Sequence, residues 1–110
     1  MAAMVVREKY LDTLRVFGDV EQQLDTAVEE YVTRRIIERI KSARERVSEF
    51  ETRYGMAYSI FAERVQLDEA FYDQISQANL LWEQEALEWM YWDKEIQHWS
   101  RKLNDILNKS

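Results

Sequence analysis

The 36-residue stretch from Asp19 to Tyr54 lies between the two glycines of the chain and contains neither glycine nor proline. Asp19 can cap the amino end of a helix, and Gln22 can reach back to complete a capping box. Gly55 follows directly, where a left-handed helix cap favours a residue without Cβ. The sequence therefore predicts one helix over 19–54, which at ~1.5 Å per residue is about 50 Å long.

Apolar side chains recur along this predicted helix at helical spacing. They form one stripe of ten residues: Val20, Leu24, Val28, Val32, Ile36, Ile40, Ala43, Val47, Phe50 and Tyr54. A single helix cannot bury its own apolar stripe. This helix therefore needs a partner helix, either from the same chain or from another one.

The composition points to one class of fold. Of the 110 residues, 33% are charged and 13% are aromatic, with two glycines and no proline. This is typical of helical bundles, because sandwiches and βαβ folds need turn residues. We expect a single all-α domain over 1–110, built as an antiparallel hairpin of two long helices (a coiled-coil bundle) with short connecting helices. No cysteine and no long apolar run occur, so we expect a cytoplasmic protein without disulfides or a membrane span.

The last predicted helix, over 80–108, carries a seven-residue apolar repeat. Its position a holds Trp82, Trp89, Ile96 and Leu103, and its position d holds Glu85, Trp92, Trp99 and Ile106. Seven of these eight positions are apolar, which is typical of a coiled-coil helix.

All four tryptophans of the chain lie on this seam. Tryptophan at both positions suits a groove wider than that of a two-helix coil, and each buried indole N–H needs an acceptor. Further apolar residues widen the face: Leu81, Leu87, Met90, Tyr91 and Leu107. This favours a homodimeric four-helix arrangement or a different partner protein. The alternative is that the seam is filled within one chain.

Charge is unevenly distributed along the chain, whose formal net charge is −6. Residues 33–53 have a net charge of +3, whereas residues 59–99 have a net charge of −7. The simplest interpretation places the basic half of the first long helix along the acidic later helix. Exposed ion pairs contribute only ~0–1 kcal/mol each, but they favour antiparallel over parallel pairing.

Residues 10–17 fit either a helix or a short β-strand. As a helix, its apolar residues share one face; as a strand, Thr13 and Arg15 point outward. Ribbon-helix-helix dimers present such a strand to the major groove of DNA, although the break that this family needs in its first helix is missing. We favour an extended segment here, used for packing or dimer pairing.

Residues 55–79 are expected to connect the two long helices and to contain short helices of their own. Ser59 and Asp68 are the predicted N-caps of these helices. The connector is too apolar for a solvated loop and is expected to close one end of the bundle with five side chains: Phe61, Val65, Leu67, Phe71 and Ile75.

Few residues of the chain suit catalysis or metal binding. Glu95 and His98 form a Glu-x-x-His pair, which ferritin-like di-iron bundles use twice. The pair occurs once here and His98 is the only histidine, so a metal site would need two chains and a further glutamate such as Glu38 or Glu45. There is no nucleophilic triad and no glycine-rich phosphate loop. We therefore expect no enzyme, no cofactor and no metal site; a metal site at a dimer interface is our third-ranked hypothesis.

Three segments resemble a known group of proteins. They are YLDTLRVFGDVEQQLDTAVEEY at 10–31, RYGM at 53–56 and WEQEALEWMYWDKEIQHW at 82–99. Together they are similar to small helical proteins of bacteria and archaea that are the antitoxin-like partners of TumE-family toxins, and the similarity extends from about Tyr10 to Leu107. This resemblance implies a protein that binds and neutralises a cognate toxin.

The residues expected to bind such a partner lie on the acidic, tryptophan-rich helix: Trp82, Trp89, Trp92, Trp99, Glu85, Glu88 and Tyr91. Tryptophans are frequent hot spots of interfaces, and the acidic side chains would take the place of nucleic-acid phosphates on a basic toxin. The alternative hypothesis is a DNA-binding regulator. Its expected DNA contacts are Thr13, Arg15, Arg34, Arg35 and Arg39.

Overall fold

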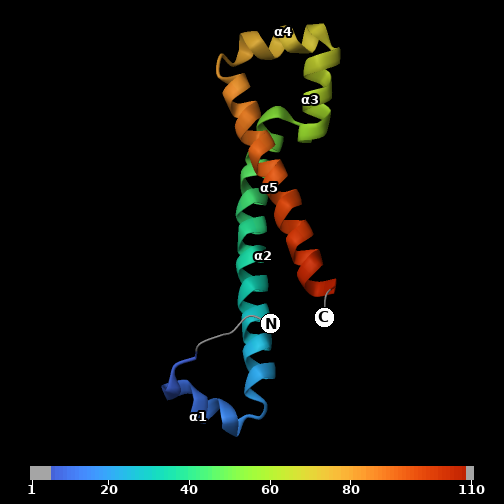
Figure 1. Cartoon of the computed structure of the whole chain (residues 1–110). Helices are drawn as coiled ribbons and strands as arrows, with labels where there is room; N and C mark the ends of the chain where they lie inside the picture. The colour runs from blue at the N-terminus through green and yellow to red at the C-terminus, as the bar shows by residue number, and fades with distance from the viewer. Residues whose placement is uncertain (1–5, 109–110) are drawn as a thin grey trace. The chain divides into compact units, whose positions relative to one another are not determined.

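All regular secondary structure in the described part of the chain, residues 6–108, is helical. The computed structural model contains the helices α1 (Glu8–Val16), α2 (Val20–Tyr54), α3 (Tyr58–Leu67), α4 (Glu69–Ala78) and α5 (Trp82–Asn108) (Figure 1). The predicted all-α class is therefore confirmed. Two compact units divide between Arg35 and Ile36. Unit 1 contains α1 and the first part of α2, and unit 2 contains the rest of α2 with α3, α4 and α5.

The extended segment expected at 10–17 is wrong, because most of this segment lies in helix α1. Glu8 in the first turn and Arg15 in the last turn suit the helix dipole. The side chain of Arg15 also pairs with Asp12 one turn away, at 3.2 Å. The helix ends where Gly18 takes a positive φ of 123°, a conformation that glycine adopts readily.

Both ends of α2 follow the capping signals in the sequence. The carboxylate of Asp19 accepts hydrogen bonds from the backbone N–H groups of Glu21 (3.0 Å) and Gln22 (3.4 Å). The side chain that reaches back is that of Gln23, not Gln22 as predicted: its amide donates to the carbonyl oxygens of Leu14 and Asp19. At the other end, Gly55 has a φ of 72°, and its N–H donates to a carbonyl of the last turn.

The connector consists of α3 and α4, and one of its two predicted caps is confirmed. The carboxylate of Asp68 accepts a hydrogen bond from the N–H of Phe71 at 3.1 Å and so caps α4. The predicted cap at Ser59 is wrong, because α3 already begins at Tyr58 and Ala57 occupies the capping position.

Four of the five apolar connector residues pack against the core of unit 2, as expected. Phe61 and Phe71 are buried, while Val65 and Ile75 are half-buried against them. Leu67 is the exception, since it is 77% exposed at the end of α3.

Helices α2 and α5 run antiparallel within unit 2 (Figure 1). Contacts between them fall at decreasing residue numbers in α2 and increasing numbers in α5. Arg53 pairs with Glu85, the ring of Phe50 lies 5.8 Å from that of Trp89, and Arg46 lies over Trp92. These contacts use positions a and d of the α5 repeat. The predicted antiparallel hairpin is confirmed.

Aromatic rings form most of the core of unit 2. Trp89 is completely buried, with four other rings placed around it at centroid distances of 5.1–5.8 Å: Phe50, Tyr54, Tyr58 and Phe61. These rings come from α2 and α3, so Trp89 packs α5 against two different helices at once. At Trp89 the tryptophan seam is therefore filled by the same chain.

Replacing Trp89 with alanine should destabilise the protein by about 3–5 kcal/mol, because the removed ring leaves a cavity that its neighbours fill only partly. The matched surface control is Leu80→Ala, since Leu80 is 91% exposed. This control should change stability by less than about 0.5 kcal/mol. Urea unfolding followed by circular dichroism measures both, and equal stabilities of the two variants would contradict the proposed core.

Candidate protein-interaction surface

Two of the four seam tryptophans are core residues rather than surface anchors. Trp89 is fully buried and Trp82 is nearly so. Trp82 packs edge-on against Phe61 and Tyr72, from α3 and α4. This corrects the expectation that these two side chains are exposed anchors for a partner, because Trp89 is fully covered and most of the surface of Trp82 is covered by its own chain.

The other two tryptophans, Trp92 and Trp99, are half-buried and lie beside arginines of α2. The guanidinium carbon of Arg46 is 5.9 Å from the ring centre of Trp92, and that of Arg39 is 5.8 Å from Trp99. Such cation–π contacts contribute about 0.5–1 kcal/mol at exposed sites. Arg39, an expected DNA contact, therefore already packs against a ring of its own chain.

The indole N–H groups of Trp89 and Trp92 are buried without a hydrogen-bond acceptor in the described structure. The sequence-based expectation that each buried indole finds an acceptor is therefore wrong for these two. An unpaired buried donor costs about 1–3 kcal/mol. The surroundings of Trp89 are mainly other aromatic rings, which offer packing but no strong acceptor.

Glu85, the one polar residue on the seam, is held in a polar cluster between α2 and the start of α5. Its carboxylate pairs with Arg53 and accepts hydrogen bonds from the hydroxyl of Tyr54 and the amide of Asn79. The amide of Asn79 also donates to the Tyr54 hydroxyl at 3.2 Å. Burial, with the hydrogen bond and charge of Glu85, raises the pKa of Tyr54 to about 12. Glu85 is thus a structural residue, although the sequence predicted a partner contact.

Beyond the core, α5 and the two residues before it present exposed side chains that we call the outer face: Leu80, Leu81, Leu87, Glu88 and Tyr91. Leu87 is 63% and Tyr91 53% exposed. Hydrogen bonding to Glu95 raises the pKa of the Tyr91 hydroxyl. Neighbouring large apolar side chains in solvent often mark an interaction site. Of the predicted partner-binding residues, Glu88 and Tyr91 belong to this face.

A pocket of about 390 Å³ lies beside the outer face, and we call it the aromatic pocket. Its lining comes from three helices: Tyr58 of α3, Tyr72 of α4, and Trp82, Glu83, Ala86 and Leu87 of α5. The rings of Tyr72 and Trp82 meet at 84°, with their centres 5.5 Å apart. Tyr58 and Tyr72 were not among the predicted site residues, because their sequence spacing marks them only as apolar positions of short helices.

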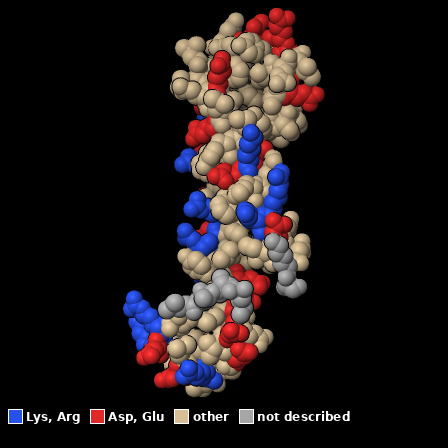
Figure 2. Space-filling view, in the orientation of Figure 1, with Lys and Arg blue, Asp and Glu red and all other residues tan. Residues whose placement is uncertain are grey.

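The end of unit 2 that holds this pocket is acidic. Residues 57–90 contain seven acidic side chains and one basic side chain, Arg64. Within unit 2, Figure 2 shows acidic side chains over α3 and α4, whereas the basic ones gather where α2 and α5 run side by side. Burial and the nearby charge of Asp93 both raise the pKa of Tyr58. The potential at this end therefore favours a cationic partner.

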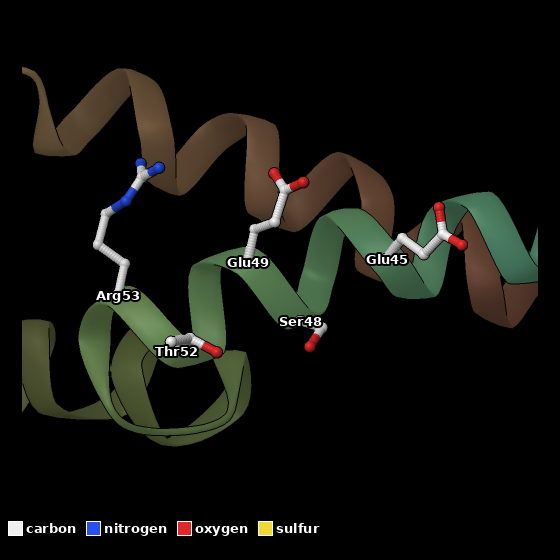
Figure 3. A pocket seen from close by; sticks show the side chains of 5 residues that line it. All are labelled: Glu45, Ser48, Glu49, Thr52 and Arg53. Carbon is white, nitrogen blue, oxygen red and sulfur yellow. The ribbon is translucent and has the colours of Figure 1, made fainter.

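A larger depression of about 670 Å³ lies along α2, and its lining is polar. All five lining residues lie on that one helix and are exposed: Glu45, Ser48, Glu49, Thr52 and Arg53 (Figure 3). The guanidinium of Arg53 is occupied by Glu85. No histidine or buried acid activates the two hydroxyl groups, so we assign no chemistry to this depression.

Of the residues expected to contact DNA, Thr13 and Arg15 are not arranged as predicted, whereas Arg34, Arg35 and Arg39 lie on the expected long helix. Thr13 and Arg15 are exposed on helix α1, and the described part of the chain contains no strand. The ribbon hypothesis therefore loses its structural basis. Arg34 and Arg35 are exposed on α2.

The Glu-x-x-His pair does not form a metal site within one chain. Glu95 is half-buried, and the exposed ring of His98 lies 4.9 Å from that of Trp99. Among residues 6–108, no three acidic, histidine or cysteine side chains are grouped closely enough to hold a metal. Within the same residues, no helix has the length and apolar character needed to cross a membrane.

Comparison of the chain with protein-family models, with curated proteins and with solved structures found no match.

The raised pKa of Tyr54 predicts a loss of stability at high pH. Because the folded-state pKa of about 12 lies above the ordinary value of 10.0, the contribution of this hydroxyl is complete below pH 10 and declines as the pH rises towards 12. Urea unfolding across this pH range should show the decline. Tyr54→Phe has no hydroxyl to ionise there and should show a flatter pH dependence. Identical pH profiles for the two proteins would contradict the assignment.

Proposed function

We propose that this chain is a non-enzymatic binding module that docks onto a basic protein through the outer face and the aromatic pocket of unit 2. The observation that carries the proposal is the exposure of Leu87 and Tyr91 beside an end of the molecule with a large excess of acidic residues. Apolar anchors supply affinity in protein interfaces, while complementary charge speeds association and selects the partner.

The resemblance to antitoxin-like partners of TumE-family toxins supports a toxin as this basic protein. A toxin that acts on nucleic acid has a basic surface that binds the nucleic acid. Acidic side chains on α5 would compete with the nucleic acid for this surface. Glu88 and Tyr91 keep the role expected from the sequence and Leu87 joins them, whereas Trp82 and Trp89 build the scaffold beneath them.

Mixing the protein with the product of the adjacent gene, which the resemblance implies to be a toxin, should give a complex at micromolar concentration. Leu87→Asp and Tyr91→Ala should each weaken it about tenfold or more, since central apolar anchors typically contribute over 1 kcal/mol. Leu67→Ala is the matched control, because Leu67 is also an exposed leucine but lies outside both surfaces. Isothermal titration calorimetry gives the affinities. Absence of a complex, or equal affinities of all variants, would end the proposal.

We also infer that two copies of the chain associate through unit 1. None of the described residues of this unit is fully buried, since every buried residue of α2 lies at Ile36 or beyond. Several large apolar side chains of unit 1 are exposed: Tyr10, Val16, Phe17, Val28 and Tyr31. An isolated helix as short as the nine residues of α1 is marginal in water, so this unit needs a cover.

The charges of α2 favour a second copy as that cover. Residues 19–33 contain five acidic and no basic side chains, and the basic residues Arg34 and Arg35 follow them within unit 1. Two α2 helices in antiparallel arrangement around a two-fold axis bring the acidic part of each near the basic part of the other. A parallel arrangement juxtaposes like charges, which is unfavourable.

Light scattering during size-exclusion chromatography should therefore give the mass of a dimer at micromolar concentration. Val28→Glu and Tyr31→Glu place a charge where the association buries an apolar side chain, so both should shift the protein towards the monomer. Leu67→Glu introduces the same charge on α3 and should leave the dimer intact. A monomeric wild-type protein would refute this inference.

A further inference from the structure

We propose that the aromatic pocket binds the guanidinium group of an arginine side chain supplied by the partner. This inference rests on the proposed function, because the same basic protein provides the arginine. It adds the chemical identity of one anchor, which neither the sequence pattern nor the resemblance indicates.

The walls of the pocket suit a flat cation. Three aromatic side chains from three different helices line it: Tyr58, Tyr72 and Trp82. The rings of Tyr72 and Trp82 stand perpendicular to each other in this lining. Guanidinium groups stack on aromatic faces and are more weakly hydrated than ammonium groups, so they enter such sites at a lower desolvation cost.

The charge of the pocket also matches a cation. Glu83 is exposed and contributes a carboxylate to the lining, while no basic residue lines the pocket. Asp93 is close enough to Tyr58 for its charge to raise the pKa of that hydroxyl. A carboxylate can accept two parallel N–H hydrogen bonds from a guanidinium, which a lysine ammonium cannot reproduce.

Elsewhere in the described part of unit 2, four aromatic side chains have an arginine of the same chain over or beside the ring. Arg39 lies over Trp99, Arg46 lies over Trp92, and Arg53 and Arg64 lie over phenylalanines of the core. In the described structure, the rings of the aromatic pocket have no such contact. The one basic residue of this end, Arg64, is placed over Phe71 at 4.0 Å and near Asp68. The pocket is thus open to an arginine from outside the chain.

A small probe tests the pocket without any partner. Nα-acetyl-arginine methylamide, titrated into the full chain, should shift the NMR signals of the Trp82 indole and the Tyr72 ring, with an affinity in the millimolar range. The citrulline analogue has nearly the same shape without the charge and should bind at least about fivefold more weakly. The inference would be overturned if both probes shifted the NMR signals equally, or if the only shifted signals came from residues outside the pocket.

Two variants identify the groups that bind the probe. Glu83→Gln removes the charge with little change of shape, and Tyr72→Leu removes a partly exposed ring; each should weaken arginine binding about three- to tenfold, as expected for loss of one charged or cation–π contact. Glu63→Gln is the matched control, because Glu63 is an exposed glutamate of α3 outside the pocket lining. Unchanged binding by Glu83→Gln and Tyr72→Leu would overturn the inference.

Repeating the Glu83→Gln measurement with the toxin-like partner separates this inference from the proposed function. If the complex forms and Glu83→Gln weakens it while Glu63→Gln does not, both are supported. If the complex forms with unchanged affinity for Glu83→Gln, the arginine site is refuted and the proposed function stands. If no complex forms although the arginine probe binds, the proposed function is refuted and the pocket assignment stands.

Discussion

The burial of one indole ring among four others holds unit 2 together. Trp89 joins rings of α2 and α3 to α5, so the long antiparallel pair and the short connector share a single packing centre. Fully burying an aromatic side chain contributes about 1.5–3 kcal/mol from removal of apolar surface alone. This favourable free energy offsets the cost of leaving the indole N–H of Trp89 without a hydrogen bond.

The polar cluster around Glu85 complements this packing by fixing how the helices align. Rings tolerate small sliding movements, but the carboxylate of Glu85 must meet Arg53, Tyr54 and Asn79 together. Asn79 also accepts a hydrogen bond from the N–H of Leu81 and so caps the start of α5. The Asn79 side chain therefore sets where α5 begins and, through its hydrogen bond to Glu85, helps to set which residues of α2 lie opposite the start of α5. The outer face and the aromatic pocket take their positions from this alignment.

Local signals predicted most of the helices, and contacts between distant residues account for what was missed. The caps at Asp19, Gly55 and Asp68 and the repeat of α5 depend on neighbouring residues, so the sequence alone reveals them. Residues 10–17 are too few to show a clear helical repeat of apolar residues, and several of their side chains favour strands. The prediction of an extended segment was therefore wrong. The pocket joins Tyr58, Tyr72 and Glu83 from three helices, and no spacing along the chain predicts that meeting.

The boundary between the two units lies inside the continuous helix α2. On one side of Ile36 the helix is anchored by a core, and on the other it relies on backbone hydrogen bonds and local side-chain contacts. Amide protons of the first turns should therefore exchange with solvent sooner than those near Phe50. Trypsin, which cuts after arginine and lysine, should therefore cleave after Arg34 and Arg35 sooner than after the later arginines of α2. Under the proposed association of two copies, the lifetime of the intact chain would depend on its own concentration, because association would protect the segment that folding alone leaves uncovered.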